Sequence, residues 1–220
     1  MRYAEAAPTP ILRKKVFKMD DIVRQAMAKW PNVPHCYGWL ALDARGAWRM
    51  RDERAQQQGL AGDTIRHPAL LDFIRRNYAA DDSGCWFFQN GPQRVYVNLA
   101  LAPYIARTDP EHGFVTHTGA ALSQIDRAWL CETGVLILQS GAIVAALDDR
   151  DIAQCLTQLR IGERAASDEQ LLAWLAHDAD ESATAPLMLL HAGRQYPLQH
   201  LRQADLAAYF GFVSTPQIKA

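Results

Sequence analysis

One stretch of the sequence, "RTDPEHGFVTHTG" (residues 107–119), concentrates side chains that bind metal ions or move protons: Asp109, Glu111, His112 and His117. Carboxylate oxygens and imidazole nitrogens are ligands for zinc and related ions, and a carboxylate beside such an ion can act as a base. One hypothesis is therefore a metal-assisted hydrolase with Asp109, His112 and His117 as ligands and Glu111 as base. The HExxH spacing of zinc hydrolases is absent from the stretch, which argues against this hypothesis.

The same stretch has the composition of a turn that leads into a strand. Asp109 followed by proline is typical of the start of a turn, Gly113 suits its end, and "FVTHT" has strand character. On a strand, His117 would share a side with Val115. We therefore predict no metal site here, and we retain His117 as a candidate ligand-binding residue because it interrupts an otherwise neutral strand.

Other catalytic patterns are missing from the sequence. It contains no GxSxG nucleophile elbow, no GxxxxGK[ST] phosphate loop and no GxGxxG after a predicted strand, so we predict no catalytic residues and no cofactor. Three acids, Asp148, Asp149 and Asp151, lie where a helix begins, and the helix dipole favours acids there. The cysteines form no CxxC pair and are predicted to be separate reduced thiols: Cys36, Cys85, Cys131 and Cys155.

Two arginines join His117 as predicted ligand-binding residues. Arg66 lies at the entrance of a predicted helix, and Arg94 follows the turn of the hairpin "CWFFQNGPQRVYVNLAL". The aromatic side chains of this hairpin suggest base stacking, but the basic motif of an RNA-binding sheet is missing, and aromatic residues on strands usually form core. With 23 basic and 24 acidic residues and a net charge of -1, we expect no nucleic-acid partner.

The bulk composition is that of a folded, water-soluble chain. Its 220 residues, 49% of them hydrophobic, suffice for one large domain or two small ones. The N-terminal residues contain no continuous apolar run, which indicates that the chain has no signal or transit peptide and is cytoplasmic. The most apolar run, "GVLILQSGAIVAALDD", is interrupted and too short for a membrane span, so no membrane association is expected.

The elements that must position these residues follow a recurring pattern. Two strands joined at a glycine turn and followed by a helix are predicted around Gly46, Gly141 and Gly193, and a hairpin at Gly91 lacks the helix. Such a unit cannot bury its apolar surface alone. We therefore predict an α+β fold of repeated strand-turn-strand-helix units, packed into one or two intertwined small domains. The predicted parts are residues 1–34 (an N-terminal segment and helix), 35–160 (the core) and 161–220 (a helix plus one hairpin-helix unit).

Local signals add detail to this scheme. Asp20 is predicted to be the N-cap of the first helix, and Ser167 with Gln170 forms a capping box before another. Cys155 belongs to the apolar stripe of a helix. Residues 51–63 are polar and lack periodic apolar positions, so we expect a surface loop that carries no core.

From about Cys36 to Leu159 the chain resembles a bacterial family catalogued as domain of unknown function 1285. The similar segments, in order, are "GWLALDARGAWRM", "TIRHPALLDFIRRNY", "GCWFFQNGPQRVYVNLALAPYIA", "FVTHTGAALSQID" and "GAIVAALDDRDIAQCLTQL". The resemblance implies a new α+β fold of repeated motifs, a suggested part in signalling or regulation, and no assigned activity or catalytic residue. The chain departs from the family at residues 51–63 and by extra elements from Gly162 to Ala220.

Together these observations favour a non-enzymatic bacterial protein that binds a small ligand or a protein partner in regulation or signalling. The metal-assisted hydrolase at residues 109–117 is the alternative. A third hypothesis is self-association, with a homodimer formed through exposed sheet edges or an apolar face.

Overall fold

The structure is a computed structural model that describes residues 19–176 and 186–218. Contacts within the chain divide it into two compact units, each drawn from separate segments. Unit 1 comprises residues 1–43, 47–101 and 207–220, and unit 2 comprises residues 44–46 and 102–206. The predicted α+β class is confirmed. The predicted boundaries at residues 34 and 160 stay predictions, and residues 1–18 of the predicted N-terminal part lie outside the described residues.

Unit 1 is built on a six-stranded sheet in the order β3-β2-β1-β6-β5-β4. The β1–β6 pair is parallel and the other neighbours are antiparallel. Its elements are α1 (Asp21–Lys29), β1 (Cys36–Leu42), β2 (Trp48–Met50), α2 (Glu53–Gln57), β3 (Asp63–Thr64), α3 (Pro68–Arg76), β4 (Tyr78–Ala80), β5 (Trp86–Asn90) and β6 (Gln93–Leu99).

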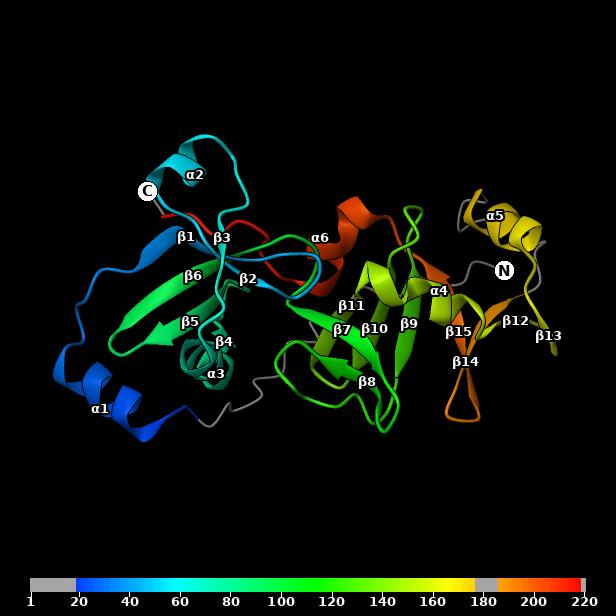
Figure 1. Cartoon of the computed structure of the whole chain (residues 1–220), viewed down its shortest axis with the longest axis horizontal. Helices are drawn as coiled ribbons and strands as arrows, with labels where there is room; N and C mark the ends of the chain where they lie inside the picture. The colour runs from blue at the N-terminus through cyan, green and yellow to red at the C-terminus, as the bar shows by residue number, and fades with distance from the viewer. Residues whose placement is uncertain (1–18, 177–185, 219–220) are drawn as a thin grey trace, which may run out of the picture. The chain divides into compact units, whose positions relative to one another are not determined.

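One face of this sheet carries the core of unit 1. Trp48 on β2 meets the ring of Tyr78 edge-on at 5.1 Å, and Tyr78 lies 4.8 Å from Trp86. Helix α3 covers part of this face, since Phe73 packs edge-on against Phe88 at 5.3 Å (Figure 1). Buried aromatic pairs of this kind contribute about 0.5–1.5 kcal/mol each beyond the apolar area that they bury.

Unit 2 is built on a nine-stranded sheet in the order β13-β12-β14-β15-β9-β10-β11-β7-β8. Here β11–β7 and β15–β9 are the parallel pairs. Its elements are β7 (Tyr104–Asp109), β8 (Gly113–Thr116), β9 (Arg127–Leu130), β10 (Leu136–Ser140), β11 (Ile143–Leu147), the 3-10 turn η1 (Asp149–Asp151), α4 (Ile152–Leu156), β12 (Leu159–Ile161), β13 (Arg164–Ala165), α5 (Asp168–Ala176), β14 (Leu187–His191), β15 (Arg194–His200) and the 3-10 turn η2 (Gln203–Asp205). Helix α6 (Leu206–Phe210) follows η2 and contains the boundary between the units.

The same three-stranded arrangement occurs in both units. In unit 1 the meander β4-β5-β6 is extended by the parallel strand β1, and in unit 2 the meander β9-β10-β11 is extended by β7. A buried glutamine precedes the second turn of each: Nε2 of Gln89 donates to Gly91 O at 2.9 Å, and Nε2 of Gln139 donates to Gly141 O at 3.4 Å. The two meanders therefore share their turns as well as their strand order.

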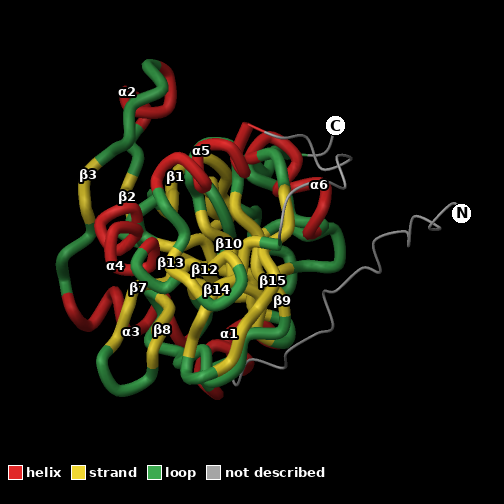
Figure 2. The backbone as a smooth tube through the Cα atoms, turned by 90° about the vertical axis from the view of Figure 1, so that its right-hand side faces the viewer, coloured by secondary structure: helices red, strands yellow, loops and turns green. Residues whose placement is uncertain are grey.

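The sheet of unit 2 curls so that distant strands meet. Strand β14 is third and β8 ninth in the strand order, yet the ring of His191 at the end of β14 lies 4.7 Å from that of Phe114 on β8. Gly113 leaves room for this ring, because a Cβ there would lie 2.3 Å from His191 Cε1. Figure 2 shows these strands in yellow and the helices α4 and α5 in red.

The hairpins predicted at Gly46, Gly141 and Gly193 are present, and each is followed by a helix: α2, α4 after η1, and α6 after η2. The hairpin at Gly91 leads to β7 with no helix between. Three of the hairpins have two-residue turns, at residues 91–92, 141–142 and 192–193. The third turn begins with Ala192 at φ 48°, and the other two begin with glycine at a similar angle. A hairpin turn of two residues needs such positive φ values because of the twist of its strands.

Two local predictions need correction. Residues 51–63 are not a structureless loop: the carboxylate of Asp52 caps α2 by accepting from Ala55 N at 2.7 Å, and Ala55 is buried. Asp20 is at the N-cap position of α1 but does not cap it, because its carboxylate accepts from Arg76 and Asn77 of the neighbouring α3 end instead.

The predicted capping box before α5 is confirmed. Ser167 N donates to Gln170 Oε1 at 2.9 Å, and Gln170 N donates to Ser167 Oγ at 3.3 Å. Cys155 is buried on α4, as its apolar stripe predicted. Across the described residues, none of the helices combines the length and the apolar composition of a membrane span.

Candidate functional site

The acidic and histidine side chains at residues 109–117 serve mainly to shape a turn between β7 and β8. Asp109 Oδ1 accepts hydrogen bonds from the backbone N–H groups of His112 at 2.8 Å and Glu111 at 3.0 Å. It also lies 3.0 Å from Nδ1 of His112. The backbone hydrogen bond from His112, followed by the contact with its ring, lowers the pKa of Asp109. The carboxylate therefore closes the turn, as the turn interpretation predicted.

His117 has a separate environment from this turn. It follows the end of β8, and its backbone N–H donates to Ile105 O at 2.7 Å. Its ring Nδ1 accepts from Ile105 N at 3.2 Å, and the ring lies 5.9 Å from that of Tyr104. Within residues 19–176 and 186–218, no three His, Cys, Asp or Glu side chains are grouped so that they could hold a metal ion. The hydrolase alternative thus lacks the ligand group that it requires.

The predicted ligand-binding residues lie in three separate segments of the chain. Arg66 is exposed in the connection between β3 and α3. Arg94 is half-buried on β6. Strands β2 and β1 lie between β6 and β3, the strand that precedes Arg66. His117 belongs to unit 2. Of the three, Arg94 has the most distinctive surroundings.

Of the three acids before α4, Asp148 acts as a cap, as predicted. In contrast, Asp149 pairs with Arg45, and Asp151 makes no cap hydrogen bond to α4. Asp148 accepts from Arg150 N at 3.0 Å and forms an ion pair with the guanidinium of the same residue. Asp151 Oδ2 accepts from the backbone N–H of Thr108 at 2.7 Å. These carboxylates are engaged in fastening η1 and the strand β7 beside it.

The surroundings of Arg94 follow from the alternation of β5 and β6. Trp86 and Phe88 point to the core face of the sheet, so Phe87 between them points to the other face. The register pairs Phe87 with Tyr96 and Gln89 with Arg94. Phe87, Arg94 and Tyr96 therefore lie together on the opposite face, where Arg94 is half-buried while Phe87 and Tyr96 are 4% and 5% exposed.

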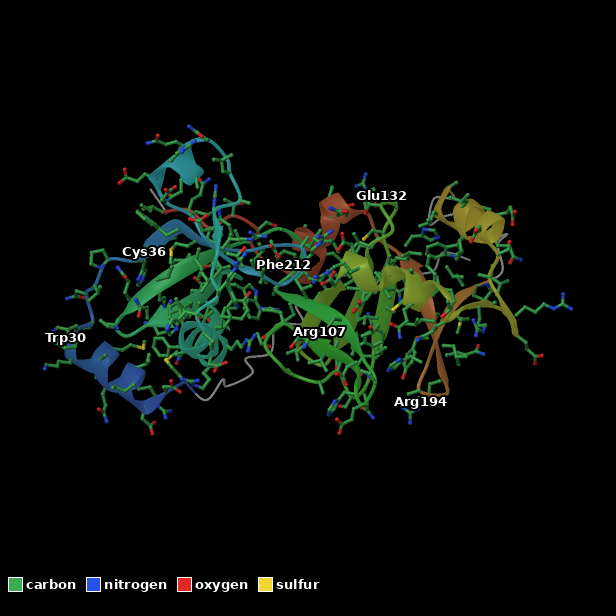
Figure 3. All side chains as sticks on the ribbon, viewed as in Figure 1. Trp30, Cys36, Arg107, Glu132, Arg194 and Phe212 are labelled. Carbon is green, nitrogen blue, oxygen red and sulfur yellow. The ribbon has the colours of Figure 1, made fainter. Side chains whose placement is uncertain are left out.

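A bulge in β1 adds a tyrosine to this group. Cys36 pairs with Val95 and Leu40 with Val97, so β1 has two extra residues between these points. Gly38 within the bulge has φ 80°, an angle that L side chains rarely adopt. Figure 3 labels Cys36 at the start of this strand. The result is that Tyr37 stacks on Tyr96, with ring centroids 4.6 Å apart and planes 11° from parallel.

We call Tyr37, Phe87, Arg94 and Tyr96 the tyrosine–arginine surface. The Tyr96 hydroxyl donates to Asp81 Oδ2 at 3.0 Å. Burial raises the pKa of Tyr96 to about 12, and an interaction with Arg94 opposes part of that rise. The hydroxyl is therefore protonated at neutral pH and serves as a fixed donor to Asp81.

Arg94 differs from the other arginines of similar burial. Its guanidinium carbon lies 4.4 Å from the centre of the Phe87 ring, a cation–π contact. Among the described residues four arginines are half-buried. Three of them donate to carboxylate, hydroxyl or carbonyl oxygens: Arg49, Arg51 and Arg160. Within the same described part of the chain, Arg94 has neither a carboxylate nor a carbonyl partner.

Sequence reasoning identified Arg94 but not its neighbours. The alternation across a two-residue turn was available as a signal, and it separates Trp86 and Phe88 from Phe87 and Tyr96. Nothing in the sequence pointed to Tyr37, because a strand bulge of two residues depends on the pairing of β1 with β6. Gly38 was the one feature of the local sequence that is consistent with the bulge.

Comparison with known proteins places the chain in a family without assigned function. No curated protein matches it. Its structure is similar to that of a DUF1285 family protein from Silicibacter pomeroyi DSS-3, with 14% sequence identity and a TM-score of 0.46, over 79% of this chain and 86% of the other. The resemblance predicted from the sequence is confirmed to that extent. The model of a family described as "Protein of unknown function (DUF2946)" matches residues 19–217. The chain belongs to this family.

Proposed function

We propose that this chain is a non-enzymatic protein-binding module with a regulatory role, and that the tyrosine–arginine surface of unit 1 is its binding surface. One observation supports this above all: the pair Phe87–Tyr96 in unit 1 has the aliphatic pair Ile137–Ala146 at the matching position in unit 2. The shared scaffold does not require aromatic and charged residues at this position. Tyrosine, tryptophan and arginine dominate the binding energy of protein interfaces.

Of the two kinds of partner that the sequence left open, the arrangement favours a protein over a small ligand. The four residues lie on three neighbouring strands, β5, β6 and β1, with the half-buried Tyr37 and Arg94 accessible and the buried rings of Phe87 and Tyr96 supporting them from beneath. Trp39, also on β1, is 41% exposed. Large side chains that are rigid and partly exposed lose little conformational entropy on binding.

Peptide display on the full-length protein, followed by NMR titration of the selected peptides, tests this proposal. We expect the shifted backbone amides to cluster on β1, β5 and β6, and Tyr37→Ala to weaken binding by at least about tenfold, a loss of roughly 1.4 kcal/mol. Tyr196→Ala is the matched control, because Tyr196 is a half-buried tyrosine on β15 of unit 2.

Selection of no peptide, or shifts confined to unit 2, would contradict the proposal. Amide spectra of both variants must show that the fold is kept. Light scattering over a range of protein concentrations is the second measurement: if the unliganded protein forms a dimer that Tyr37→Ala abolishes, the partner is a second copy of this chain.

A further inference from the structure

We infer that the segment bound by the tyrosine–arginine surface is acidic, with a side-chain carboxylate received by Arg94. This inference rests on the proposed function and adds the chemistry of the partner to it. It is carried by the charge of Arg94, whereas the proposed function is carried by the aromatic residues around it.

The first step concerns the cost of the present arrangement. A guanidinium that is partly removed from water loses hydration, and proteins restore this loss with acceptors. Arg49 has the carboxylate of Asp43 and the hydroxyl of Thr64, at 2.7 and 2.6 Å. Arg94 lies over the Phe87 ring, which attracts the cation but accepts no strong hydrogen bond, and its interaction with the Tyr96 hydroxyl engages only part of its five N–H groups. The remaining N–H groups are thus the donors that a partner would satisfy.

The second step concerns the nearest acid. Asp81 lies beside the surface, but its carboxylate is already engaged: Oδ1 accepts from the backbone N–H groups of Ser83 at 2.9 Å and Cys85 at 3.0 Å, and Oδ2 accepts from Tyr96. It holds the turn before β5 and fixes the Tyr96 ring. Asp81 keeps its charge, but these donors occupy its oxygens, and among the described residues no carboxylate oxygen accepts a hydrogen bond from Arg94.

The third step concerns the form of the partner. The planar fork of a guanidinium matches a carboxylate, with two parallel hydrogen bonds. His35, which is exposed and edge-on to the Tyr96 ring at 5.8 Å, supplies a further nitrogen at the margin of the surface. The half-buried ring of Tyr37, which stacks on the buried Tyr96 ring, offers an apolar contact. An extended segment that alternates acidic and aromatic residues fits this order of groups.

Fluorescence polarisation with three labelled hexapeptides tests the inference on the full-length protein. The probes alternate tyrosine with glutamate, glutamine or lysine. We expect the glutamate peptide to bind at least about tenfold more tightly than the glutamine peptide, and the lysine peptide to bind least. Raising the salt concentration should reduce this preference.

Arg94→Met should abolish the preference for glutamate over glutamine, because methionine keeps much of the apolar stem and removes the charge. Arg94→Lys should keep part of it, since lysine retains the charge without the planar fork. Arg107→Met is the matched control, an exposed strand arginine in unit 2 that should leave binding unchanged.

Equal binding of the glutamate and glutamine peptides, both weakened by Tyr37→Ala, would overturn the acidic partner and leave the proposed function standing. Absence of binding by all three peptides, together with failure of the display experiment, would remove both. A labelled oligothymidine that binds through Arg94 more tightly than the glutamate peptide would also overturn the inference, in favour of a single-stranded nucleic acid.

Discussion

The meanders β4-β5-β6 and β9-β10-β11 have the same strand order and the same two turns, but they differ in what they bury. In unit 2, β11 is buried along its whole length, and so are the first four residues of β10. In unit 1, the first three residues of β6 are half-buried, among them Arg94. The matched residues make the difference explicit: Gln89 faces Arg94 in unit 1, and Gln139 faces Val144 in unit 2.

This contrast teaches where function can be sought in a fold that contains related parts. Residues that both meanders share, such as the glutamine before the second turn, serve the scaffold. Residues that differ in chemistry at matching positions are not demanded by the scaffold. Phe87, Arg94 and Tyr96 of the tyrosine–arginine surface are such residues. Three mutational tests can break or sharpen the contrast.

The largest effect is expected at the first turn of each meander. Gly84 and Gly134 have φ values of 78° and 82°, so alanine at either position is strained by about 1 kcal/mol. A Cβ on Gly84 would also lie 2.2 Å from the carbonyl oxygen of Gly211, whereas one on Gly134 would meet nothing within 4 Å. We expect Gly84→Ala to cost about 2–4 kcal/mol and Gly134→Ala about 1 kcal/mol in urea unfolding.

This pair tests whether the turn of unit 1 is fixed by the C-terminal segment that also pairs with Cys85 through Val213. If the two variants lose the same stability, the close approach of Gly84 to Gly211 does not constrain the turn.

The next largest effect is expected at the matched positions Arg94 and Val144. Val144→Ala removes buried apolar volume and should cost about 2 kcal/mol. Arg94→Ala loses mainly the cation–π contact and should cost less than about 1 kcal/mol, while peptide binding falls. Urea unfolding and fluorescence polarisation measure the two quantities. An Arg94→Ala variant as unstable as Val144→Ala would show that Arg94 is part of the scaffold.

The fold was predictable where local chemistry decides it. Ser167 and Gln170 predicted a capping box, and the glycine turns at residues 91, 141 and 193 predicted hairpins, because each of these features depends on a few adjacent residues. The strands β4, β9 and β12 have three or four residues each and were not foreseen. Segments this short carry too few alternations to be recognised, and pairing with neighbours far along the chain stabilises them.

The candidate site was predictable only in part, for the same reason. Arg94 was found by its place after a turn. Arg66 and His117 were chosen by residue type and local position, which do not show which side chains meet, and the structure does not group Arg66 with Arg94. The metal ligands considered at residues 109–117 are close in sequence, but in the structure the carboxylate of Asp109 accepts a backbone hydrogen bond within the turn. Tyr37 reaches Tyr96 through a bulge set by non-local pairing, which residue order does not reveal.

The smallest effect is expected at the third copy of the hairpin, where His191 takes the place of Asn90 in unit 1 and Ser140 in unit 2. Burial lowers the pKa of His191 below the ordinary value of 6.5. The unfolded chain then takes up the proton at a higher pH than the folded chain, so this side chain favours folding above pH 6.5, and the advantage is lost as the pH falls through the lowered pKa.

His191→Ser should therefore flatten the fall in unfolding free energy between pH 8 and pH 5, measured by urea unfolding, while the other six of the seven histidines are unchanged. If the pH slope of the unfolding free energy is the same in His191→Ser as in the unchanged protein, the contact of His191 with Phe114 and Gly113 persists when the ring is charged. The third copy would then tolerate a polar residue at this position as the second copy tolerates Ser140.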